Sequence, residues 1–292
     1  MPTFRHLLAA TVALAAVAAS SNANATAYAY GNINFTNLVL NGLNSPNVTI
    51  QSANVATSTS ANYPGFAPDG STAGPVNISN PLTQGSDVRQ SFSGPGPAPA
   101  ENTYTQALLA AAGTRGDAQL VGNLITGVNT GANDVAEGRI TVPGSAASTA
   151  GTSTGFSVIV AVSATTTFTL TFNGSTNLAA TTTLPGEFSS SSVSASFTIN
   201  QGQNNNLLTY SPDALNQSVT STGNGQNSSL NTPITAFSSA PLTLSAGTYQ
   251  FSLLSGAQER LTSPAAAVPE PASMALLGAG LAAIGVLRRR RA

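Results

Sequence analysis

Alternation of apolar and hydroxyl side chains is the feature that most restricts the fold of this chain. Residues 165–172 alternate threonine with phenylalanine and leucine, and residues 193–199 alternate in the same way. A period of two puts every second side chain on one face of a strand, so that face can be buried while the other meets water. Residues 156–162 are continuously apolar and rich in β-branched side chains, as in a fully buried strand.

Shorter patterns extend this β character over most of the chain. Residues 33–40 and 47–51 are expected to form strands, and residues 241–254 are expected to form two strands around Ala246-Gly247. Asn173-Gly174 is expected to make a turn, because both residues tolerate a positive φ. Many short strands separated by Gly, Asn and Pro predict a mainly β chain folded as a jelly-roll-like β-sandwich.

Two stretches interrupt the β pattern. Thr103–Ala112 is predicted to form the one short helix, ended by Gly113, and residues 115–117, which spell Arg-Gly-Asp, to form a turn after it. Residues 91–100 contain alternating Gly and Pro and are expected to be a long loop or a linker. The body is then either one sandwich with a long insertion or two domains that divide near residue 100.

Composition limits the chemistry that the chain can perform. Only 7% of the residues are charged, compared with about 25% in ordinary proteins, and Cys, Trp and Lys are absent. The single histidine, His6, lies in the expected leader. A disulfide framework, a Cys/His metal site, a Ser-His-Asp triad and a Lys-rich nucleic-acid surface are therefore excluded. We expect no enzyme activity, no catalytic residues, no cofactor and no metal.

The carboxylates of the chain allow two further kinds of site, a glycosidase site and a calcium site. A pair of them could serve a glycosidase, but no Trp is available to bind a sugar face. Asp69, Asn80 or Asp134 could ligate calcium, but no D-x-D-x-D pattern accompanies them.

The N-terminus has the pattern of a secretory signal peptide. Arg5 gives a positive start, Leu7–Ala19 is apolar or small except for one threonine, and Ala23-Asn24-Ala25 is an A-x-A cleavage pattern. We expect residues 1–25 to be removed by cleavage after Ala25, with Ala23 and Ala27 as alternatives. The chain is therefore expected to be exported through the inner membrane.

The C-terminus has the pattern of a short membrane segment that is stopped by positive charge. Residues 272–287 are uncharged and mostly apolar, which gives about 24 Å of helix at 1.5 Å per residue. This length is below the roughly 30 Å of the hydrocarbon core, so the span is marginal. Four arginines follow it, and positive charge stays on the cytoplasmic side of the membrane. These membrane-stop residues are Arg288, Arg289, Arg290 and Arg291.

A Pro-Glu-Pro sequence stands directly before this segment. The motif consists of Val268, Pro269, Glu270 and Pro271, followed by the apolar run and the arginine cluster. In this order the elements resemble the PEP-CTERM sorting domain of exopolysaccharide-producing Gram-negative bacteria, here over residues 266–292. The resemblance implies recognition and cleavage by exosortase, a membrane-embedded enzyme, with transient anchoring in the inner membrane. A plain single-pass anchor is the alternative.

Loss of both basic ends would leave a weakly acidic body, residues 26–265. It has four arginines and nine carboxylates, a net charge of −5. This charge argues against nucleic acid as a partner.

The sequence therefore predicts an exported structural protein of the cell surface or of the extracellular matrix, associated with exopolysaccharide or biofilm. Its expected partners are exosortase, the inner membrane before processing, and extracellular polysaccharide. The alternative is a carbohydrate-binding surface module that uses Tyr and Asn side chains. A third possibility is a self-assembling fibre subunit, because polar β-prone segments with few charges can stack as cross-β structure.

Overall fold

The computed structural model describes most of the body of the chain. The described residues are 26–66, 69–70, 76–77, 85–106, 109, 112–123, 130–141, 146–202, 205–223 and 225–264. Strands hold 74% of them, and the helical residues among them form one short 3₁₀-helix, Asp213–Leu215. The prediction of a mainly β chain is confirmed.

The structure does not describe the two segments that are predicted to enter the membrane. The signal peptide, residues 1–25, and the helix predicted over residues 272–287 both lie outside the described residues. Within the described part, no helix is long and apolar enough to cross a membrane.

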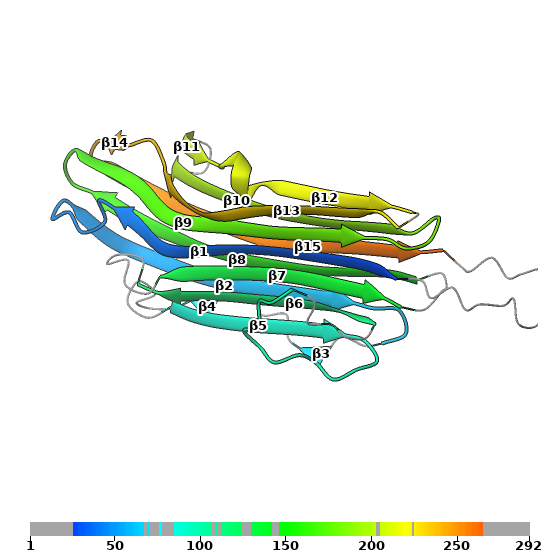
Figure 1. Ribbon diagram of the computed structural model, residues 1–292. Helices are drawn as coiled ribbons and strands as arrows, with labels where there is room; N and C mark the ends of the chain where they lie inside the picture. Colours follow the sequence, from blue (N-terminus) through cyan, green and yellow to red (C-terminus); the bar gives the residue numbers. More distant parts are fainter. Residues whose placement is uncertain are drawn as a thin grey trace, which may run out of the picture. The chain divides into compact units, whose positions relative to one another are not determined.

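All strand pairs are antiparallel, and the strands form two sheets (Figure 1). The first sheet has the order β13-β9-β1-β7-β6-β5-β3, with β14 paired to one end of β9. Its strands are β1 (Ala27–Asn41), β3 (Asp69–Gly70), β5 (Gly85–Ser93), β6 (Gly113–Gly122), β7 (Gly131–Ile140), β9 (Thr166–Thr181), β13 (Asn227–Ser238) and β14 (Leu242–Leu244).

The second sheet has the order β11-β10-β15-β8-β2-β4, with β12 also paired to β10. Its strands are β2 (Val48–Asn62), β4 (Val76–Asn77), β8 (Ala146–Val162), β10 (Phe188–Gln201), β11 (Asn205–Tyr210), β12 (Gln217–Thr222) and β15 (Gly247–Ser263). The strands expected at 156–162 and 193–199 lie within β8 and β10, the one expected at 165–172 begins at Thr166 in β9, and the two expected within 241–254 are β14 and the first part of β15.

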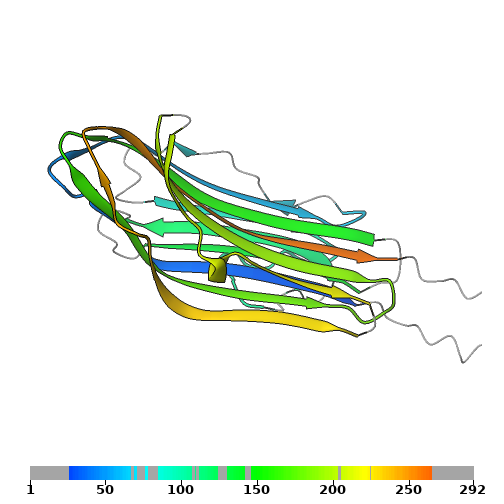
Figure 2. The ribbon, with the colours of Figure 1, turned by 90° about the horizontal axis from the view of Figure 1, so that it is seen from above.

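The two sheets pack face to face around one core, as Figure 2 shows from above. Phe168 of the first sheet lies with its ring centroid 4.9 Å from that of Phe251 in the second. Along β9 and β10 buried residues alternate with half-exposed ones, so the period of two in the sequence becomes the inside and outside of the layers. This packing agrees with the predicted sandwich, and the jelly-roll-like connectivity stays a prediction.

The turn predicted at Asn173-Gly174 is wrong. Strand β9 runs through both residues without a break. Gly174 is needed for space rather than for a turn, because a Cβ there would lie 3.0 Å from Leu215 and 3.1 Å from Phe237. The glycine lets these two side chains pack against the strand.

The helix predicted over Thr103–Ala112 is also wrong. Its described residues, 103–106, 109 and 112, are not helical. Side chains take the backbone groups that a helix would use. Arg115 donates hydrogen bonds to the carbonyl oxygens of Thr103 and Thr105, at 2.5 and 3.0 Å, and the Tyr30 hydroxyl donates to that of Tyr104 at 2.5 Å. These contacts hold the described part of the segment against the sheet as irregular chain.

The two chain ends of the body leave from the same end of the sheets. Strand β1 begins where strand β15 ends (Figure 1). Pro264, after β15, lies close to the loop at Gly186, and the Thr26 amide, before β1, donates to the Thr183 hydroxyl at 3.0 Å. The opposite end of the body, where β1 ends and β15 begins, is called the distal end below.

Candidate functional site

The sequence places its candidate site residues at the two ends of the chain, and all of them lie outside the described residues. They are Ala23 and Ala25 of the signal cleavage site, Val268, Pro269, Glu270 and Pro271 of the sorting motif, and Arg288, Arg289, Arg290 and Arg291 of the membrane stop. Within the described body, charged and polar side chains form clusters of their own.

A buried ion pair lies on the outer face of the first sheet. Arg115 of β6 stands opposite Glu137 of β7 in the strand register, and its Nε lies 2.7 Å from a Glu137 carboxylate oxygen. Both side chains are fully buried. The second oxygen of Glu137 accepts a hydrogen bond of 3.0 Å from the Tyr28 hydroxyl. Arg139 completes the group, with its guanidinium 5.1 Å from the centre of the Tyr28 ring.

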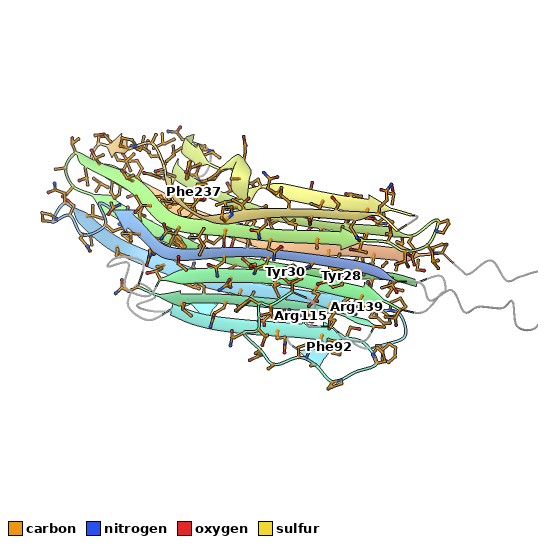
Figure 3. All side chains as sticks on the ribbon, viewed as in Figure 1. Tyr28, Tyr30, Phe92, Arg115, Arg139 and Phe237 are labelled. Atoms are coloured by element: carbon orange, nitrogen blue, oxygen red, sulfur yellow. The ribbon has the colours of Figure 1, made fainter. Side chains whose placement is uncertain are left out.

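The strap formed by residues 99–106 covers this pair and keeps water from it. The Gln90 amide donates to the Pro99 carbonyl at 2.9 Å, and the Thr103 amide donates to an Asp117 carboxylate oxygen at 3.3 Å. Burial raises the pKa of Asp117 to about 6, although the hydrogen bond from Thr103 and the charge of Arg115 oppose this rise. Figure 3 shows Tyr28, Tyr30, Arg115 and Arg139 together over β1, β6 and β7.

The Arg-Gly-Asp sequence is therefore not a turn, contrary to the sequence prediction. Residues 115–117 lie in the middle of β6, and the side chains of Arg115 and Asp117 are both buried. In this position the sequence offers no surface for recognition. Its charged groups hold the strap to the sheet.

Two further carboxyl groups lie between the sheets. Asp134 points inward from β7 and accepts hydrogen bonds from the hydroxyls of Ser255 and Thr154, at 2.6 and 2.8 Å. Burial raises its pKa to about 6, because it outweighs these hydrogen bonds, which favour the charged form.

Glu259 of β15 is buried in the same interior, against Gly138 of β7. A Cβ at Gly138 would come within 2.6 Å of the Glu259 carboxyl group, so this position is restricted to glycine. Burial raises the pKa of Glu259 well above its ordinary value, and the negative charge of Glu137 adds to this rise. Burial therefore favours the neutral form of this acid.

The outer face of the second sheet is, in contrast, nearly free of charge. The register of β10, β15, β8 and β2 places mostly hydroxyl, amide and small side chains in rows across it, with Leu254 as an exposed apolar side chain among them. The central row joins Ser194, Gly256, Ser153 and Ser58. Among the described side chains of these four strands, Arg260 is the charged group on this face. We call this surface the neutral face.

A pocket of about 450 Å³ lies on the outer side of the first sheet near the distal end. It forms where β1 changes its register against β9 between Thr36 and Val39. Its lining has no charged side chain and consists of Asn37, Val39, Thr171, Phe172, Asn173, Ala236, Phe237 and Ser238. These residues could not be identified from the sequence, because the pocket depends on a register shift that no local pattern marks.

No group of three or more His, Cys, Asp or Glu side chains that could hold a metal ion occurs in the described part of the chain. Comparison with protein families shows that residues 267–291 match the PEP-CTERM protein-sorting motif. Searches of curated proteins and of solved structures gave no match to the chain. The chain therefore carries a PEP-CTERM motif, which indicates an exported surface protein that is sorted by an exosortase.

Proposed function

We propose that this PEP-CTERM protein is a non-enzymatic structural element of the extracellular exopolysaccharide matrix. One observation carries the proposal. The described body keeps most of its ionisable side chains inside, where Arg115, Glu137, Asp134 and Glu259 hold strands and the strap together, and it presents the neutral face outside. Because these carboxyl groups are closed from solvent, a substrate cannot reach them. A neutral hydroxyl and amide surface can form hydrogen bonds with a hydroxyl-rich polymer.

Exosortase processing is the second part of the proposal. The sorting motif supports it, and the body needs no permanent anchor for a role in the matrix. The chain would be held transiently in the inner membrane by residues 272–287 and then be released to the surface or the matrix.

The test of the matrix role is co-sedimentation of the protein with exopolysaccharide from the producing cells. We expect the wild type to sediment with the polymer and to stay bound in about 1 M salt, because salt screens charge but weakens neutral hydrogen bonds little. Replacing Ser153 and Ser194 with Glu puts two charges at the centre of the neutral face and should release the protein.

The matched control is the double substitution of Ser175 and Ser229 with Glu. Both serines lie on the outer side of the first sheet, so the same change in charge leaves the neutral face intact. Release of the wild type by salt, or equal binding by the two double variants, would contradict the proposal.

A carbohydrate-binding module is the second candidate function, and the uncharged pocket near the distal end favours it. A module of this kind binds a defined sugar with saturation, whereas a structural element associates with the polymer along a surface. A fibre subunit is the third candidate function, and it would have to associate through an edge strand such as β13.

A further inference from the structure

We infer that the pocket near the distal end is a binding site for a neutral sugar unit. The inference rests on the carbohydrate-binding alternative and adds to it a position and a class of ligand. The pocket has the volume of a small-molecule site, since such sites span about 300–1,000 Å³.

The lining of the pocket selects the ligand by its chemistry. Thr171 and Asn173 alternate along β9 with the buried Phe172, so they face away from the core. The amide groups of Asn37 and Asn173 have no hydrogen-bond partner among the described side chains, and each can both donate and accept. A ligand rich in hydroxyl groups has the same double capacity, so its groups can pair with these amides.

The charge of the pocket lining and its apolar surface restrict the class of ligand further. The lining has no cation to hold a phosphate or a carboxylate and no anion to hold an amine. Most of the exposed surface of the pocket is apolar, with Val39 and Ala236 contributing to it, and this surface suits the C–H face of a sugar ring. A neutral saccharide fits this combination better than a charged sugar or a peptide with charged side chains.

The backbone holds the pocket open before any ligand binds. Asn37 has a φ of 55°, in the left-handed region that Asn tolerates better than most residues, at the place where the register of β1 shifts. The regular pairing of β1 with β9 is interrupted at this point, and Asn37 lies within the interruption. A site that is already formed loses less conformational freedom when it binds.

The location of the pocket suits a surface protein. Asn37 is ten residues along β1 from Ala27, roughly 30 Å at about 3.3 Å per residue. Figure 3 shows Phe237, beside the pocket, toward the opposite end of the body from Tyr28 and Arg139. The pocket therefore lies at the end of the body opposite to the one where β15 ends.

Isothermal titration and ligand-observed NMR can test the site on the secreted protein. The probes are neutral monosaccharides and disaccharides, neutral oligosaccharides from the producing cells' exopolysaccharide, acidic sugars and a mixed peptide set. We expect saturable binding of at least one neutral sugar. Asn37→Gly keeps the left-handed backbone and removes the amide, and Ala236→Tyr fills the pocket, so each should weaken binding at least tenfold.

Asn231→Tyr is the matched control. Asn231 is exposed on the same strand and face as Ala236 but lies outside the pocket, so its substitution should leave binding unchanged. The inference is overturned if no neutral sugar binds with saturation, if only acidic sugars or peptides bind, or if both pocket variants bind like the wild type. Co-sedimentation through the neutral face is measured separately, so failure of the pocket would leave the matrix role standing.

Discussion

Arg115 and Glu137 show how a chain with few charges uses the ones it has. Their ion pair lies where no solvent reaches it, so the loss of either partner leaves a charge buried without compensation. The same guanidinium binds two carbonyl groups of the strap, which a shorter side chain cannot reach.

Arg115→Met should therefore destabilise the body by about 3–5 kcal/mol. Urea unfolding at neutral pH measures this change, and limited proteolysis should then cut within residues 99–106. Arg260→Met removes an exposed arginine and is the control, with an expected change below about 1 kcal/mol. If Arg115→Met unfolds like the wild type, the pair does not hold the strap.

The buried carboxyls predict an unusual dependence of stability on pH. The folded state holds Asp134 with a pKa of about 6, above its ordinary 3.8. The folded state favours the neutral form of Asp134. Its contribution to the free energy of unfolding is therefore complete below about pH 4 and is lost as the pH rises to about 6. The shift corresponds to about 3 kcal/mol. The raised pKa of Glu259 has the same sign and extends the loss to higher pH.

Asp134→Asn should remove most of the Asp134 contribution to this decline, because an amide does not ionise. Chemical unfolding from pH 4 to pH 8 compares it with the wild type. Asp213→Asn changes an exposed carboxyl and should keep the decline of the wild type. An equal pH dependence in Asp134→Asn and the wild type would show that Asp134 is not held neutral.

At the scale of elements, the strands could be predicted from the sequence, but the covering of the outer face of the first sheet by the strap could not. Alternation marks β9 and β10 because one of their faces is apolar. Strand β6 is buried on both faces although it contains Arg, Asp and Gln, so its pattern resembles that of a loop. The burial arises from the strap, and only tertiary contacts show that the strap is an irregular segment rather than a helix.

Strand β13 is an edge of the first sheet and bears on the fibre hypothesis. Its pairing with β9 shifts between Thr232 and Thr235, and Pro233 lies within the shift. Proline has no amide hydrogen to donate, and a bulge bends the edge away from a new partner. Ile234, which is 74% exposed, would otherwise present an apolar side chain to a second chain.

Pro233→Val should therefore promote association through this edge. Sedimentation velocity and thioflavin fluorescence over a concentration series should show larger species for the variant and a monomer for the wild type. Pro241→Val, outside the strands, is the control and should behave like the wild type. Fibres formed by the wild type would favour the fibre subunit instead, and a monomeric Pro233→Val would show that Pro233 does not protect the edge.

For the whole molecule, the body and the sorting tail perform separate tasks. The described body has its own hydrophobic core between its two sheets. The apolar segment of the tail, if helical, would be about 24 Å long, and under the proposed sorting it would serve only to present the Pro-Glu-Pro motif at the membrane while the arginines hold it. Cleavage near Glu270 would then release a folded protein.

Glu270→Ala should accordingly leave the protein in the inner membrane at full tail length, because the motif is damaged while the apolar segment and the arginines are intact. Deletion of residues 288–291 should give unprocessed secreted chain, because the marginal segment loses its stop. Cell fractionation and intact-mass measurement follow both changes. Glu101→Ala removes an exposed carboxylate of the body and should be sorted like the wild type. If the mass of the wild-type surface protein still includes residues 274–292, the tail is an anchor, and processing by exosortase is not what places this protein at the surface.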